Sequence, residues 1–100
     1  MSLETVSEAL RAKAPEFAGL NAKVRFDLGD DGSLMVDATS RPPSLSEEAG
    51  EADCTIALSL ENLEKLMAGT LSPTFAYTMG KLKVDGSMGL AMKLAALLEE

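Results

Sequence analysis

Residues 81–98 read KLKVDGSMGLAMKLAALL and decide the fold of this chain. Lys81 to Asp85 alternate between polar and apolar side chains, which predicts a strand that Gly86 closes. Ser87 is a typical N-cap residue, and a helix is predicted to follow it. The apolar side chains of this helix cover an arc of roughly 220°, about twice the stripe of a surface helix. Because one sheet covers only one side of such a helix, its second side needs another helix, a partner chain or an apolar ligand.

Three further strands are predicted upstream of this segment. Alternating residues flank Asp30-Asp31-Gly32-Ser33, and two such runs around an Asp-Gly turn predict a hairpin over residues 22–40. Residues 53–58 form a third run, in which Cys54 shares a face with two aliphatic side chains. Together with residues 81–85, these runs predict one sheet. Its helix-covered face is expected to carry Val24, Phe26, Leu28, Leu34, Val36, Ile56, Leu82 and Val84.

Three further helices accompany these strands. Apolar spacing predicts a helix over residues 3–14, which Pro15 ends because the residue before a proline avoids the helical region. Ser59 and Ser72 are predicted to cap two short helices, each of which ends at a glycine. Strands with polar outer faces and helices gathered after them predict an α+β fold. We expect a mainly antiparallel sheet with helices covering one of its faces.

The composition limits the number of domains and the class of partner. One hundred residues predict a single domain spanning residues 1–100. The net charge of −7 argues against nucleic-acid binding and against electrostatic docking on anionic membranes. A single cysteine excludes an intramolecular disulfide, the N-terminus does not resemble a signal peptide, and the one long apolar stretch is too short to cross a bilayer. We therefore expect a cytoplasmic protein.

Residues that usually carry catalysis are scarce. The chain has no histidine, which removes the commonest general base and the commonest metal ligand. Cys54 is predicted to be a buried core thiol, since no histidine can activate it. A hairpin turn explains Asp30-Asp31, and a solvated loop explains Glu47-Glu48. We expect no catalytic residue, no metal site, no cofactor and no enzymatic activity from this chain alone.

Two blocks of the chain resemble the sterol carrier protein 2 family. The first block is DCTI at residues 53–56 with SLENLEKLMAGTLSP at residues 59–73, and the second is MGKLKVDGSMGLAMKL at residues 79–94. The second block is the more specific. A Gly-Lys-Leu-Lys strand that ends at glycine and leads into a Leu-x-x-Lys-Leu helix is the usual closing signature of that family. The resemblance implies a five-stranded sheet with an apolar tunnel between sheet and helices, so a fifth strand is expected within residues 41–52.

The resemblance also implies a ligand and the residues that bind it. The resemblance implies that the tunnel holds a sterol, a fatty acid, a fatty acyl-CoA or a phospholipid, which the protein would transfer between membranes without catalysing a reaction. The residues carried over are Phe75, Met79, Leu82, Val84, Met88 and Met92 on the tunnel wall, with Leu66, Met67 and Leu71 on its helical side. The chain ends in Leu98-Glu99-Glu100 and lacks the basic N-terminal helix of some members, so the resemblance favours a stand-alone cytoplasmic carrier over a peroxisomal one.

Two other functions stay open from the sequence. The second apolar side of the last helix also fits a ligand-free dimerisation or interaction module, in which it meets a partner chain. The chain also fits an accessory domain that delivers substrate within a larger enzyme. We expect either a monomer or a dimer, with at most transient membrane contact. A stripe of Met and Leu at helical spacing is also typical of plain core, so the pattern alone does not require a cavity.

Overall fold

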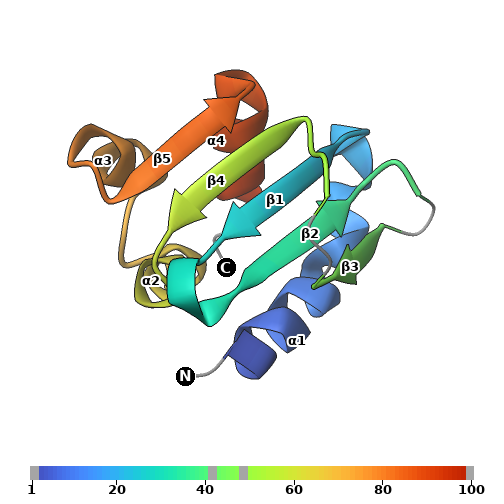
Figure 1. Cartoon of the computed structure of the whole chain (residues 1–100), viewed down its shortest axis with the longest axis horizontal. Helices are drawn as coiled ribbons and strands as arrows, with labels where there is room; N and C mark the ends of the chain where they lie inside the picture. The colour runs from blue at the N-terminus through green and yellow to red at the C-terminus, as the bar shows by residue number, and fades with distance from the viewer. Residues whose placement is uncertain (1–2, 41–42, 48–49, 99–100) are drawn as a thin grey trace.

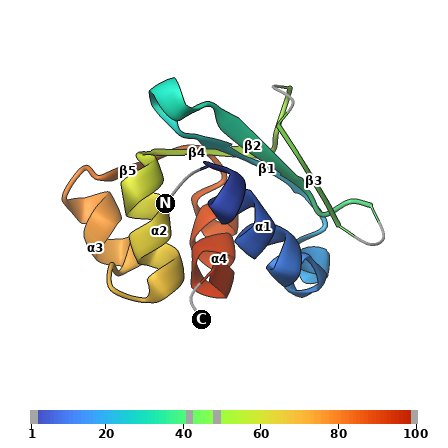
Figure 2. The same cartoon turned by 90° about the horizontal axis from the view of Figure 1, so that it is seen from below.

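The computed structural model describes residues 3–40, 43–47 and 50–98, which form a five-stranded sheet with helices on one face (Figure 1; Figure 2). The strands are β1 Lys23–Asp27, β2 Ser33–Asp37, β3 Ser44–Ser46, β4 Cys54–Leu58 and β5 Leu82–Gly86. The α-helices are α1 Leu3–Lys13, α2 Leu60–Ala68, α3 Pro73–Thr78 and α4 Met88–Leu98, and the 3-10 helices are η1 Ala14–Leu20 and η2 Gly29–Asp31. The predicted α+β class is confirmed.

The sheet is mixed, and three of its four strand pairs are antiparallel. The strand order is β3-β2-β1-β4-β5. The one parallel pair is β1 with β4, because the chain leaves β3 at one edge and returns to the sheet beyond β1. The predicted hairpin is confirmed as the β1–β2 pair, and the fifth strand expected within residues 41–52 is β3. Strand β5 forms the other edge of the sheet.

Serine caps fix where three of the helices begin. Ser59, Ser72 and Ser87 precede α2, α3 and α4. Each serine Oγ accepts a hydrogen bond from the backbone N–H three residues later, at 3.0, 3.5 and 3.2 Å. Gly69 ends α2 in the left-handed conformation, with φ at 78°. These boundaries agree with the prediction because caps depend on a few neighbouring residues.

A 3-10 helix that the apolar pattern does not predict follows α1. Pro15 lies at the second position of η1, where its missing N–H has no intrahelical partner to lose. Phe17 and Leu20 lie three residues apart, which places them on one side of a helix with three residues per turn. Both are buried, and η1 contacts α4. Packing against α4 therefore explains this segment.

The core lies between the sheet and the helices. Of the eight side chains predicted on the helix-covered face, seven are buried and Val84 is half-buried. Val84 belongs to β5, which has a neighbouring strand on one side only. The predicted face and register are confirmed.

Helix α4 lies at the centre of the helical layer. It contacts β4 and β5 on its sheet side, α2 and α3 on one flank, and η1 on the other (Figure 2). Its buried residues are Ala91, Leu94, Ala95 and Leu98. The second apolar side of this helix therefore packs against other helices, which is the first of the three possibilities that the sequence left open. Met88, at its N-terminal end, stays exposed.

Cys54 begins β4 and is a free, buried cysteine, as predicted. Burial raises the pKa of the Cys54 thiol above its ordinary value of 9.0, and the carboxylate of Asp85 on the neighbouring strand raises it further. The thiol form therefore predominates at neutral pH, which disfavours nucleophilic chemistry.

We expect Cys54 to stabilise the fold only while it is protonated. The folded state holds the thiol proton more tightly than the unfolded state does, so this contribution is complete below the unfolded pKa and is lost as pH rises through the raised folded pKa. The difference in free energy of unfolding between wild type and Cys54→Ala should be constant below about pH 8 and shrink at higher pH. Urea titrations at several pH values measure it. A difference that stays constant through the alkaline range would contradict the prediction.

Gly86 is expected to be essential where β5 turns into α4. Its φ is 111°, and a Cβ at this position would lie 2.5 Å from the carbonyl oxygen of Asp53. Strain and overlap together should make Gly86→Ala less stable by about 3 kcal/mol. Gly89→Ala is the matched control, because a Cβ there meets no atom within 4 Å. The control should change stability by less than about 1 kcal/mol. Equal stability of the two variants in urea would show that Gly86 is replaceable.

Candidate functional site

Four of the nine predicted ligand residues belong to the hydrophobic core. Leu66 and Met67 lie on α2, Leu71 follows it, and Leu82 begins β5. All four are buried and belong to one cluster of packed side chains. We call them the inner group.

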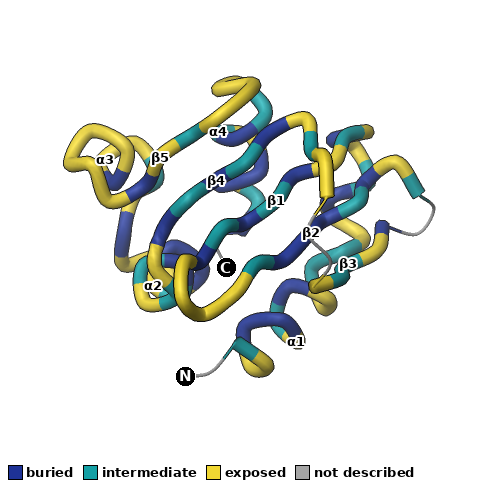
Figure 3. Tube along the Cα trace, in the orientation of Figure 1, coloured by how far each residue is buried: buried dark blue, intermediate teal, exposed yellow. Residues whose placement is uncertain are grey.

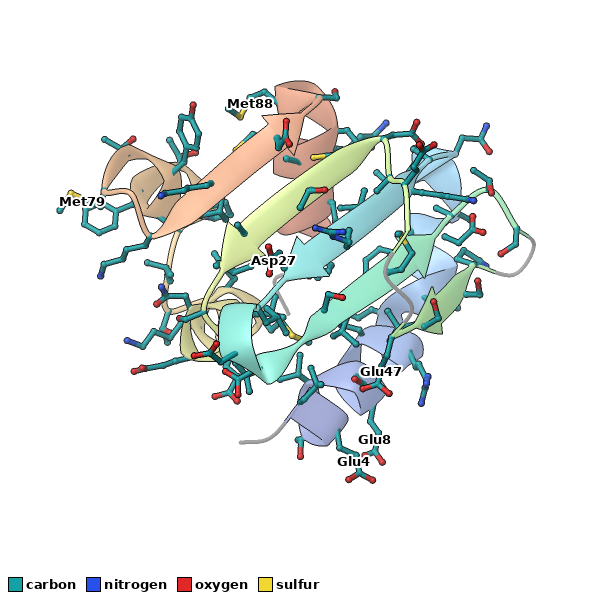
Figure 4. The ribbon with its side chains drawn as sticks, in the orientation of Figure 1. Glu4, Glu8, Asp27, Glu47, Met79 and Met88 are labelled. Carbon is teal, nitrogen blue, oxygen red and sulfur yellow. The ribbon has the colours of Figure 1, made fainter. Side chains whose placement is uncertain are left out.

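Three other predicted residues are exposed. Phe75 and Met79 are 53% and 58% exposed, and Met88 is 37% exposed. Figure 4 shows Met79 and Met88 projecting outward near opposite ends of β5. Tyr77 on α3 is 45% exposed and was not among the predicted residues. We call Phe75, Tyr77, Met79 and Met88 the outer group.

Val84 and Met92 are intermediate in burial between the outer group and the inner group. Both are half-buried and pack against the core cluster. Helix α3, which carries Phe75 and Tyr77, contacts both β5, which carries Val84, and α4, which carries Met92. Figure 3 shows that exposed, half-buried and buried positions all occur along α3, β5 and the start of α4.

The shortness of α3 explains why its aromatic side chains face solvent. The helix has six residues, and Ala76 is its one buried residue. Phe75 and Tyr77 lie on either side of Ala76 in the sequence, about 100° away from it around the helix in opposite directions. A short helix anchored by one small side chain cannot bury both rings. No sequence signal identifies Tyr77, because the burial of the neighbouring Ala76 is a property of the folded structure.

Four hollows that the described residues form lie elsewhere. One of about 470 Å³ runs beside α1 and includes Glu4, Glu8 and Glu47, and one of about 400 Å³ lies over the outer face of β2 and β3. Two smaller ones lie near the two ends of β1. None of these four is lined by any of the nine predicted residues. The predicted tunnel therefore stays a prediction.

Among the described residues, no group that could hold a metal ion includes Asp30, Asp31 or Glu47. Asp30 and Asp31 are exposed in η2, where the hairpin turns. Glu47 is exposed, and Glu48 lies outside the described residues. Among residues 3–40, 43–47 and 50–98, no group of three or more acidic or cysteine side chains is placed to hold a metal ion.

Within the same described ranges, no helix is long and apolar enough to cross a bilayer.

Comparisons with known proteins agree with this fold. The chain is 41% identical over 70 residues to Sterol carrier protein 2 of Rattus norvegicus, an alignment covering 69% of this chain and 13% of that protein. It is 34% identical over 83 residues to Hydroxysteroid dehydrogenase-like protein 2 of Bos taurus, covering 79% of this chain and 20% of that protein. The chain thus spans between an eighth and a fifth of the length of these curated relatives.

A solved structure and a family model extend the match to almost the whole chain. The apo structure of Sterol Carrier Protein 2 from Yarrowia lipolytica superposes with a TM-score of 0.76 at 23% identity, covering 95% of this chain and 84% of that one. At this identity the likeness establishes the fold. The model of the SCP-2 sterol transfer family matches residues 3–99. This chain belongs to the SCP-2 sterol transfer family.

Proposed function

We propose that this protein carries one long-chain lipid, a fatty acid or a fatty acyl-CoA, between β5 and helices α2 to α4. The family has a lipid-binding and transfer fold, and the specific ligand is our inference. The observation that carries the proposal is that apolar side chains of α2, α3, β5 and α4 include exposed, half-buried and buried members near the β5 edge of the sheet. The lipid enters at that edge and takes the place of side-chain contacts around Val84 and Met92. The whole chain acts as one lipid-binding domain in the cytoplasm and catalyses no reaction.

Weak anchoring of α3 supports an opening at this edge. The helix contributes one buried side chain, and glycines precede and follow it at positions 69 and 80. Both glycines have positive φ, at 78° and 75°, a conformation that glycine adopts without strain. Methionine side chains are unbranched and repack readily, so Met67 and Met92 suit a wall that must adapt to a ligand. Moving α3 outward would expose the inner group while β1, β2 and β4 stay packed.

The binding energy is adequate for a carrier. Removing each CH₂ group from water contributes about 0.8 kcal/mol. An acyl chain of about ten buried carbons therefore supplies about 8 kcal/mol before entropic losses, which is consistent with micromolar affinity for longer chains. At micromolar affinity the lipid can still dissociate from the protein, as a carrier requires.

A second candidate function rests on the relatives. Hydroxysteroid dehydrogenase-like protein 2 contains a segment similar to this chain in only 20% of its length. This observation favours an accessory role, in which the domain presents an apolar substrate to a catalytic domain. The two functions use the same ligand site and differ in the partner that receives the lipid.

We expect a charge in the wall to abolish binding. A fluorescent fatty acid should bind wild type at micromolar concentration and be displaced by unlabelled long-chain fatty acid. Met92→Glu should weaken binding at least about tenfold, because a carboxylate among apolar side chains is costly to desolvate. Ala96→Glu places the same charge at an exposed position of the same helix and should bind normally. Equal binding by the two variants, or no binding by wild type, would refute the proposed site.

We also expect the opening to appear in hydrogen exchange. Amides of α3 and β5 should exchange faster than those of β1 and β4, because α3 buries one side chain and β5 is an edge strand. Adding fatty acid should slow exchange in α3, β5 and the first turn of α4. Protection that instead appears beside α1 or on the outer face of β2 would place the ligand in one of the hollows described above.

A further inference from the structure

Strand β5 has a free edge and carries one cation and one carboxylate. It pairs with β4 on one side, and no strand of the described residues lies on its other side. Lys83 and Asp85 alternate with Val84, so both lie on the sheet face away from the helices, and both are exposed. Their neighbours on β4 are Ala57 and Thr55, which carry no charge. Neither charge forms a salt bridge with a residue that the structure describes.

A second copy of the chain supplies a partner for both charges in one register. If two β5 strands pair antiparallel with Val84 opposite Val84, Lys83 of each copy faces Asp85 of the other on the same face of the sheet. Opposite charges placed in this way stabilise neighbouring strands. Centring the pairing on Lys83 would instead oppose two lysines, and centring it on Asp85 would oppose two carboxylates. Among registers that keep both helical layers on one side of the sheet, the charges therefore favour the one centred on Val84.

The same register brings together exposed apolar side chains. Met79 precedes β5 and Met88 follows it, and Figure 4 shows the two side chains projecting outward near opposite ends of the strand. Antiparallel pairing places the first end of one strand beside the last end of the other, so Met79 of each copy lies near Met88 of the other copy. Helix α3, with the exposed Phe75 and Tyr77, lies beside the start of β5 (Figure 1). The outer group therefore flanks the paired strands at both ends.

We propose that two copies of this chain associate through β5, with the two strands antiparallel about Val84. The same residues contact each other from both copies, as a two-fold dimer requires, and the two five-stranded sheets become one continuous sheet. A lysine on an edge strand usually prevents pairing, and here Asp85 of the other copy offsets it. The opposite edge of the sheet is a poorer partner for β5. Strand β3 has three residues, and a contact between β3 and β5 would leave a free edge at each end and propagate into a filament.

The dimer has a consequence for the carrier, and this consequence rests on the proposed function. A second copy covers the β5 edge at which the lipid enters. The monomer is therefore the form that exchanges lipid, and the dimer is the form that retains it. Because β5 has five residues, the contact is small, and small contacts are typical of weak and reversible association.

Sedimentation equilibrium over a range of protein concentrations tests the dimer. Wild type should show a reversible equilibrium between monomer and dimer. Lys83→Asp places carboxylates opposite each other at both positions, and Asp85→Lys places lysines there, so each variant should dimerise at least about tenfold more weakly. Lys93→Asp is the matched control for Lys83→Asp, because it changes the net charge by the same amount at an exposed position of α4 outside the strand. The control should dimerise as wild type does.

Mixing the two strand variants distinguishes charge pairing from a defect in folding. In a mixed dimer, the two carboxylates of the Lys83→Asp chain face the two lysines of the Asp85→Lys chain, so opposite charges meet again at both positions. The mixture should therefore form a dimer about as well as wild type, although neither variant does so alone. A mixture that stays monomeric would overturn the proposal. A dimer that both single variants retain would also overturn it, as would a wild type that stays monomeric up to roughly 1 mM.

Fatty-acid binding separates the dimer from the proposed function. Dimerisation does not require a lipid cavity, so a dimer that binds no fatty acid would support the β5 contact and refute the proposed function. A monomeric wild type that binds fatty acid would do the opposite. If both hold, a fluorescent fatty acid should enter Lys83→Asp faster than wild type at a concentration where wild type is dimeric, because the β5 edge of the variant stays open. Equal rates of entry would show that the monomer is not the exchanging form.

Discussion

The packing of α4 beneath β4 and β5 is the contact on which the rest of the structure depends. Small side chains at Ala91 and Ala95 let this helix approach its neighbours closely, while Leu94 and Leu98 fill the core. Because apolar residues occupy about two thirds of its circumference, α4 must be enclosed rather than merely covered. Helices α2 and α3 enclose it on one flank and η1 on the other, so the whole helical layer is organised around it.

Local sequence predicted those elements that local interactions determine. The serine caps, the glycine ends and the inward face of each strand follow from a few adjacent residues, and they agree with the structure. The parallel pairing of β1 with β4 does not follow from such patterns, because it depends on where β3 leaves the sheet. Local patterns do not predict the 3-10 helix η1 either. Its two buried side chains pack in the core, where η1 contacts α4, and this packing stabilises the helix.

The sequence predicts the depth of the nine candidate residues less well than it predicts the fold. Its nine residues came from family resemblance, and periodicity alone does not separate the buried Leu82 from the exposed Met79. Depth depends on the edge position of β5 and on the single buried anchor of α3, which are both consequences of tertiary structure. The exposure of Tyr77 does not follow from the sequence for the same reason. An exposed edge strand also risks pairing with other chains, and the exposed Lys83 disfavours pairing with any strand that offers it no carboxylate.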